Sequence, residues 1–298
     1  MSDETSDDNP LRTLRVGIMG LGLMGGSLAL VLRGRVARLL AVESRPDARQ
    51  MAVRAGIVDE AIEALSPDAP PLDLLVLATP VRVILDTLAR LPAARPGGCL
   101  VLDLGSTKRA VVAAMSALPP SFAAIGGHPM CGRETSGLAA ADPDLYRDQT
   151  FILCPTGRMT PAAEATARAL VAAVGARPLW LDAAEHDALV AAVSHLPALV
   201  SAALLRAAAG ERQWAVSASG FRDTARLAGS DPRMMLDILL TNREPVLAAL
   251  DGYAGELAAV RAALATGDEA ALAEWLAAAQ VNYAAYRRFK SAEYLINK

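Results

Sequence analysis

Short apolar runs alternate with longer stretches of helical spacing from Leu14 to about Leu181. The short runs have the length and composition of buried strands, and they are bounded by glycine, proline or polar residues. The predicted strands are residues 16–19, 39–43, 74–79, 99–104, 123–126, 151–154 and 178–181. Strands that alternate with helices predict a mostly parallel α/β sheet covered by helices.

The pattern changes near residue 183, after which strand signals stop and Ala- and Leu-rich helical spacing continues. We therefore expect an α/β domain at 12–182 and an all-helical domain at 183–298. Residues 1–11 are too polar to offset the entropy of ordering, so a disordered tail is predicted there. Residues 198–209 carry little charge on any face, which predicts burial against a second copy in a homodimer. A monomer with one deeply buried helix is the alternative.

A glycine-rich turn connects the first predicted strand to an apolar helix, in the pattern Gly20-x-Gly22-x-x-Gly25. This spacing allows a sharp turn, close approach of backbone to a diphosphate, and close packing of helix on strand. Leu23 and Met24 in the same segment are candidates for cofactor binding, and the helix N-terminus would carry the anion. The fingerprint indicates a Rossmann-type, doubly wound domain that binds a dinucleotide.

The end of the second strand bears on which nicotinamide cofactor binds. Glu43 lies near the spacing at which a carboxylate accepts hydrogen bonds from the adenosine ribose, which favours NAD. Ser44 and Arg45 follow directly, and an arginine there is a common ligand of the NADP phosphate. NADP therefore stays possible. Thr79 and Pro80, at the end of another strand, are further candidates for cofactor binding.

The composition narrows the classes of partner. The formal net charge of -3 provides no basic field for nucleic acid or anionic membranes, so a small molecule and another subunit are expected. Cys99, Cys131 and Cys154 are widely spaced and odd in number, which argues against disulfides and a zinc site. No signal peptide or membrane span is predicted, and we expect a cytoplasmic protein without a metal.

Polar residues past the predicted strands should meet at one sheet edge, because ligands bind outside the carboxyl ends of strands. Ser106 follows one strand and His128 follows the next. Of the three histidines, His128 alone lies beyond a strand of the α/β domain. A neutral imidazole there suits proton removal near pH 7. Ser106 could equally be a helix N-cap.

Several motifs along the chain together resemble one family. They are the fingerprint at residues 20–27, the segment 103–108, His128-Pro-Met-Cys-Gly, Ser194-His195-Leu-Pro197, and the segment 219–226. In this order they are similar to prephenate and arogenate (cyclohexadienyl) dehydrogenases. The resemblance implies oxidative decarboxylation of a cyclohexadienol in tyrosine biosynthesis, with hydride transfer to the nicotinamide.

The resemblance also implies roles for individual side chains. His128 matches the catalytic histidine and would accept the hydroxyl proton, with Ser106 bonded to the substrate hydroxyl or to His128. Arg226 matches the arginine that grips a substrate carboxylate, and Arg222, four residues away, is its competitor. One of the two arginines could instead pair with Asp223 or Asp231. His195 would line the substrate site from the helical domain.

The pattern departs from many relatives that use prephenate, which resemble Ser-His-Leu-Pro-His where this chain has Ala198. One polar contact to the substrate side chain is therefore missing. Arg133 and Glu134 lie in the loop after His128, and either could face the ligand. The choice between prephenate and arogenate, or both, stays open.

Two other functions fit parts of the sequence. A β-hydroxyacid dehydrogenase has a similar fingerprint, but it needs a catalytic lysine in a middle helix, and Lys108, Lys290 and Lys298 are misplaced for that. A non-catalytic dinucleotide sensor would need no cluster around His128.

Lys108 is a candidate phosphate or substrate contact, and His186 is interpreted as structural.

Overall fold

The structure is a computed structural model that describes residues 10–133 and 135–296. It divides into two compact units, of which the first ends at Val246 and the second begins at Leu247. The first unit contains the sheet and the helices as far as α10. The second contains most of α11 and all described residues of α12.

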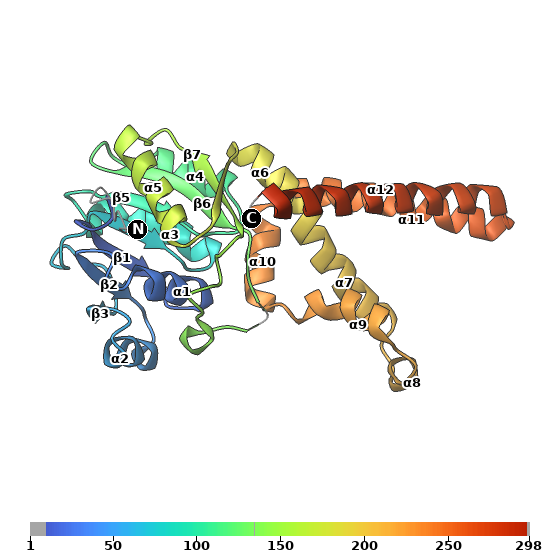
Figure 1. Cartoon of the computed structure of the whole chain (residues 1–298), viewed down its shortest axis with the longest axis horizontal. Helices are drawn as coiled ribbons and strands as arrows, with labels where there is room; N and C mark the ends of the chain where they lie inside the picture. The colour runs from blue at the N-terminus through green and yellow to red at the C-terminus, as the bar shows by residue number, and fades with distance from the viewer. Residues whose placement is uncertain (1–9, 134, 297–298) are drawn as a thin grey trace, which may run out of the picture. The chain divides into compact units, whose positions relative to one another are not determined.

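An eight-stranded sheet forms the centre of the first unit (Figure 1). The strands are β1 (Arg15–Met19), β2 (Arg38–Val42), β3 (Glu60–Ile62), β4 (Leu74–Leu77), β5 (Leu100–Asp103), β6 (Ala123–Pro129), β7 (Thr150–Pro155) and β8 (Arg177–Trp180). Their spatial order is β3-β2-β1-β4-β5-β6-β7-β8. β7 pairs antiparallel with β6, and the other neighbouring strands pair parallel. The prediction of a mostly parallel, doubly wound sheet is confirmed.

Helices cover both faces of this sheet. The helices α1 (Leu23–Leu32), α2 (Pro46–Arg54) and α5 (Pro161–Ala173) pack in one apolar core, and α3 (Val81–Ala94) and α4 (Arg109–Ser116) in another. Leu74 and Val76 belong to the first core, whereas Leu75 and Leu77 belong to the second. Because successive strand residues point to opposite faces, β4 is buried on both sides, and it therefore reads as a continuous apolar run.

The described chain after Trp180 is helical. Its elements are α6 (Ala183–Val190), a π-helix (Ala191–His195), α7 (Leu196–Ala207), α8 (Glu211–Ala215), α9 (Ser219–Ala225), a 3₁₀ turn (Arg226–Gly229), α10 (Pro232–Thr241), α11 (Arg243–Thr266) and α12 (Glu269–Ile296). The helices α6 to α10 lie in the same compact unit as the sheet. The domain boundary expected at residue 183 stays a prediction.

Three details differ from the sequence-based expectations. The edge strand β3 is not among the predicted strands, because its three half-buried residues are too few to give an alternating pattern. β6 extends to Pro129, so His128 lies within a strand instead of beyond one, because β7 pairs with it as far as that residue. Of the expected tail, residues 1–9 lie outside the described residues, but including Leu11 was wrong. Leu11 is fully buried in the core, since its apolar side chain packs there.

One helical run in the described residues, Ala183–Ala207, is long and apolar enough by length and composition to cross a membrane. It carries His186, Asp187 and His195, which are buried and hydrogen-bonded within the first unit. These polar side chains have their hydrogen bonds inside the first unit, although most of the apolar window of this run is not buried there.

Candidate active site

The glycine-rich turn folds as the fingerprint predicts. Gly20 has a φ of +93°, a backbone conformation that side chains other than hydrogen rarely tolerate. A Cβ atom on Gly25 would lie 1.9 Å from the Gly20 carbonyl oxygen, so α1 packs on this turn only because residue 25 is glycine. Gly22 is the N-cap of α1, and Leu23 is the first residue of that helix.

The surroundings of this turn fit a dinucleotide. A Cβ atom on Gly22 would meet nothing within 4 Å, so the backbone there is open to a ligand. The Thr79 hydroxyl, just after β4, is buried and has no hydrogen-bond partner among the described residues. Pro80 follows it as the N-cap of α3. The backbone carbonyl of Met24 accepts a 2.6 Å hydrogen bond from the Tyr146 hydroxyl.

Glu43 anchors the loop after β2. Its side chain is 8% exposed and accepts hydrogen bonds from the Leu21 amide at 2.8 Å and the Arg45 amide at 3.0 Å. The Arg45 guanidinium lies 3.4 Å from the same carboxylate and is half exposed. The carboxylate expected at the ribose therefore also ties this loop to the glycine-rich turn.

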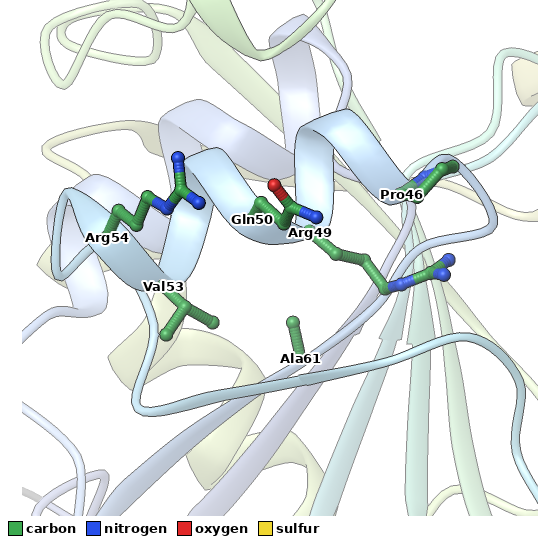
Figure 2. Close-up of a pocket in the computed structure, with 6 residues that line it drawn as sticks. All are labelled: Pro46, Arg49, Gln50, Val53, Arg54 and Ala61. Atoms are coloured by element: carbon green, nitrogen blue, oxygen red, sulfur yellow. The ribbon is translucent and has the colours of Figure 1, made fainter.

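A hollow next to this loop is lined by residues of α2 and β3 (Figure 2). Its lining residues are Pro46, Arg49, Gln50, Val53, Arg54 and Ala61. The Arg49 guanidinium donates to the Glu43 carbonyl at 2.6 Å and the Ser44 carbonyl at 2.7 Å. Because Arg49 is engaged in holding the loop, Arg45 is the better candidate for a phosphate contact.

A chain of three side chains ends at His128. The Nδ1 atom of His128 lies 2.8 Å from Nε2 of His186, and Nδ1 of His186 lies 2.8 Å from Oδ1 of Asp187. His128 is partly buried, whereas His186 and Asp187 are fully buried. The imidazole from β6 is therefore oriented by two consecutive residues of α6.

Burial first, and then the nearby His186, Lys108 and His195, lower the pKa of His128 well below 6.5. The imidazole is therefore neutral near pH 7 and can accept a proton. Lys108 does not reach a ligand, contrary to one expectation, because its ammonium is fully buried in an ion pair with Asp103. The other oxygen of Asp103 accepts a 3.0 Å hydrogen bond from the Gly127 amide. This bond joins the end of β5 to β6 at the residue before His128.

Asp187 connects α6 to α4. Its two carboxylate oxygens accept the Lys108 amide at 2.7 Å and the Arg109 amide at 2.9 Å, at the N-terminus of α4. Burial acts to raise the pKa of Asp187, but the hydrogen bonds from His186, Arg109 and Lys108 outweigh it and lower the pKa. Asp187 is therefore an ionised, buried acceptor at a helix N-terminus, where negative charge is favourable.

The remaining candidates lie in different surroundings. Ser106 is partly buried, and its hydroxyl has no hydrogen bond within the described residues. Its alternative as a helix N-cap is wrong, since α4 begins at Arg109 and Lys108 holds the cap position. Arg226 is exposed at the end of α9. Arg222 pairs with Asp223 at 3.2 Å, one of the two pairings expected.

The loop after His128 holds the last two candidates. The Arg133 guanidinium donates to Asp142 at 2.6 Å, and the amide of Asp142 in turn bonds the Ser27 hydroxyl at 2.9 Å. Arg133 is thus tied to α1 through an exposed ion pair. Glu134 lies outside the described residues.

Comparison with known families gives this site its context. The prephenate dehydrogenase nucleotide-binding domain matches residues 27–179, and the prephenate dehydrogenase dimerization domain matches residues 182–278. The chain belongs to the prephenate dehydrogenase family. This confirms the family resemblance seen in the motifs, and it favours that family over a β-hydroxyacid dehydrogenase or a sensor.

Individual relatives agree with this assignment. Prephenate dehydrogenase from Bacillus subtilis is 31% identical over 82% of this chain and 68% of its own length. Cyclohexadienyl dehydrogenase from Zymomonas mobilis is 28% identical over 85% of this chain and 89% of its own length. The crystal structure of prephenate dehydrogenase from A. aeolicus, in complex with hydroxyphenyl propionate and NAD+, is 29% identical and has a TM-score of 0.85, covering 93% of this chain and 99% of that one.

Three polar residues in this prephenate dehydrogenase family member were missed or misread from sequence. The sequence indicates a structural role for His186, but in the structure this residue contacts His128 directly. Asp187 and Asn242 received no role, although both are buried and hydrogen-bonded at the site. Polar residues at positions 186 and 187 of a largely apolar helical run were an available signal. Asn242 offered no signal, because its neighbours along the chain do not reveal its contact with His195.

Proposed function

We propose that this protein oxidatively decarboxylates prephenate, arogenate or both, with hydride transfer to a nicotinamide cofactor, in tyrosine biosynthesis. The observation that carries the proposal is the chain from His128 through His186 to Asp187, at the carboxyl end of β6. Membership of the prephenate dehydrogenase family supports it. The bound cofactor would accept the hydride from the ring carbon that bears the hydroxyl.

We propose that Nε2 of His128 is the nitrogen that acts as a base. The Asp187 carboxylate only accepts, so Nδ1 of His186 carries a hydrogen, and in a neutral His186 the Nε2 atom accepts. Nδ1 of His128 must then donate to His186, which leaves Nε2 of His128 with a bare lone pair. That atom is the proposed acceptor of the hydroxyl proton.

The protons and electrons balance without another reactant. As the hydride leaves, the hydroxyl proton moves to Nε2 of His128 and the ring carbon becomes a carbonyl. The carbon–carbon bond to the ring carboxylate then breaks, carbon dioxide leaves, and its electron pair makes the ring aromatic. His128 returns the proton to the ring oxygen, so the base is regenerated in each turnover.

We propose that Arg226 holds a substrate carboxylate, with Arg222 as its alternative, and that His195 and Ser106 contact the substrate. A planar guanidinium can donate two charge-assisted hydrogen bonds to one carboxylate. Arg226 is placed first because it matches the arginine that grips a substrate carboxylate in the family that the motifs resemble, and Arg222 pairs with Asp223. Arg133 and Glu134 remain proposed substrate contacts from the loop after β6, and the choice of substrate rests on this region.

For the cofactor, we propose NAD as the preferred form, with NADP as the alternative. Gly20, Gly22 and Gly25 would surround the diphosphate, with Leu23, Met24, Thr79 and Pro80 alongside. The buried Glu43 carboxylate favours an adenosine ribose with free hydroxyls and disfavours a phosphate by charge repulsion. Ser44 and the half-exposed Arg45 are the residues through which NADP would be held.

We also propose a homodimer formed through the helical region, supported by the match to a dimerization domain. The structure of the A. aeolicus relative contains NAD+. The reaction that we propose for this chain uses no metal. Cytoplasmic localisation stays a prediction from the sequence.

The proposal is tested by following reduced-cofactor formation with prephenate and with arogenate, each with NAD and with NADP. At least one of the four combinations should turn over. His128→Asn should lower kcat by about 10²–10⁴-fold, because general-base catalysis supplies that much, while cofactor affinity stays nearly unchanged. Turnover with none of the combinations would refute the function. Full turnover by the variant would refute the role of His128.

A further inference from the structure

Asn242 lies in the short connection between α10 and α11 and is 1% exposed. Its Nδ2 atom donates to the Asp187 carbonyl at 2.7 Å, and it lies 3.2 Å from Nδ1 of His195. One amide group therefore contacts both the backbone of the residue that orients His128 and the second imidazole of the site.

Only one of the two orientations of the Asn242 side-chain amide is compatible with its contact to the Asp187 carbonyl. A carbonyl oxygen only accepts hydrogen bonds, so a rotated Asn242 would place its own oxygen against that of Asp187. The observed orientation leaves Oδ1 of Asn242 buried without a partner among the described residues. The two contacts made by Nδ2 therefore determine how the amide is oriented.

The second hydrogen of the Asn242 amide determines the state of His195. Burial lowers the pKa of His195 to about 4, with Asp187 raising it and His186 lowering it to a smaller extent. The imidazole is therefore neutral near pH 7 and carries one hydrogen. Because Nδ1 accepts from Asn242, that hydrogen must lie on Nε2.

The backbone that carries His195 has an uncommon geometry. The chain forms a π-helix at Ala191–His195, closed by a bond from the Leu196 amide to the Ala191 carbonyl. Turns of this type are uncommon and occur frequently at functional sites. The described residues provide no hydrogen-bond partner for Nε2 of His195, so this atom can donate to a ligand.

We propose that Asn242 is a positioning residue that fixes His195 as an Nε2–H donor toward an oxygen acceptor of the ligand. His128 has the opposite tautomer, with a bare Nε2, so the two imidazoles act as one acceptor and one donor. Asp187 supports both, through its carboxylate toward His186 and its carbonyl toward Asn242. That the ligand is the dienol substrate rests on the proposed function.

The protonated nitrogens can be read from long-range ¹H–¹⁵N spectra of the histidine rings at neutral pH, without substrate. The chain has only three histidines, so single substitutions assign them. We expect a pyridine-type Nδ1 and a pyrrole-type Nε2 for His195, and the reverse for His128. A hydrogen on Nδ1 of His195 would overturn the proposal, whatever the catalytic activity.

Asn242→Leu removes the amide at similar volume. In this variant His195 should lose its single tautomer, with both ring nitrogens moving to intermediate shifts. The KM for the substrate should rise about tenfold with a smaller change in kcat and none in cofactor KM, as expected for one lost hydrogen bond.

Thr241→Val, one residue away, removes a hydroxyl that bonds Thr107 at 2.9 Å and should leave the His195 spectrum unchanged. An unchanged His195 tautomer in Asn242→Leu would contradict the proposal. If that variant does not fold, the wild-type spectrum alone decides. If the spectra agree but no dienol substrate turns over, the proposed function fails while the tautomer assignment stands.

Discussion

Gly22 and Gly25 belong to the same turn, yet alanine at the two positions should fail for different reasons. Gly25→Ala forces a Cβ against the Gly20 carbonyl oxygen, at 1.9 Å without relaxation, so α1 must shift from the turn. We expect a loss of about 1–3 kcal/mol in unfolding free energy, together with loss of cofactor binding.

Gly22→Ala is the matched control, because its Cβ would meet no protein atom within 4 Å. Its unfolding free energy should stay close to wild type, while NAD affinity falls about tenfold or more as the methyl group occupies diphosphate space. Urea unfolding and calorimetric titration with NAD measure the two effects. Equal stability losses in both variants would contradict this account of the turn.

The buried imidazole of His195 should make stability depend on pH. Its pKa is lowered to about 4 in the folded protein, and it takes up a proton near pH 6.5 when unfolded. The unfolded state therefore binds more protons in this window, and the stabilisation, complete above pH 6.5, is lost as pH falls toward 4. His128, whose pKa is lowered as well, acts in the same direction.

Between pH 7 and pH 5, His195 should account for up to about 2 kcal/mol of the decrease in unfolding free energy. Urea unfolding at a series of pH values should therefore show a shallower pH dependence for His195→Gln than for the wild type. The comparison uses slopes, so a uniform destabilisation of the variant does not affect it. Parallel curves for the two proteins would argue against a buried neutral His195.

At the level of helices, Asp182 and Asp187 lie close in sequence but make different contacts. Asp182 is the N-cap of its own helix α6, where it accepts the Ala184 and Glu185 amides at 2.8 and 2.9 Å. Asp187 instead accepts amides at the start of α4 and bonds His186 while fully buried. It connects α6 to α4 and bonds the imidazole that contacts His128.

Asp182→Ala should therefore cost about 1 kcal/mol of unfolding free energy, the usual price of a lost N-cap. Asp187→Ala should cost about 3 kcal/mol or more, because it leaves several buried donors without partners. It should also reduce kcat sharply, since His186 no longer holds His128, whereas Asp182→Ala should leave kcat near wild type. Urea unfolding and steady-state kinetics separate the two, and similar losses in both variants would count against a linking role for Asp187.

The elements differ in how far the sequence could predict them. Central strands such as β4 are buried on both faces and therefore stand out as apolar runs, and the turn at Gly20 has a spacing that few other structures require. His128 was found because it lies at the end of such a strand. Asp187 and Asn242 act on it and on His195 through contacts between helices, and no local pattern encodes those contacts.

At the scale of the whole molecule, the second compact unit exposes many apolar side chains. Within the described part of α12, Leu276, Val281, Tyr286 and Phe289 are between 59% and 66% exposed. Two helices with so much apolar surface in water lack a core of their own. We propose a second copy as the occupant, and the match of residues 182–278 to a dimerization domain, which includes Leu276, supports this.

We therefore expect the 31.0 kDa chain to sediment as a dimer, with twice that mass. Placing charges in the apolar surface, as in Leu276→Asp combined with Val281→Asp, should shift the protein toward monomers, because an unpaired carboxylate is costly to bury in an interface. Glu274→Gln, an exposed polar change on the same helix, should leave the mass unchanged. Sedimentation equilibrium over a range of concentrations measures this. A wild-type monomer, or a dimer that resists both aspartates, would mean that α12 is covered by something other than a second copy.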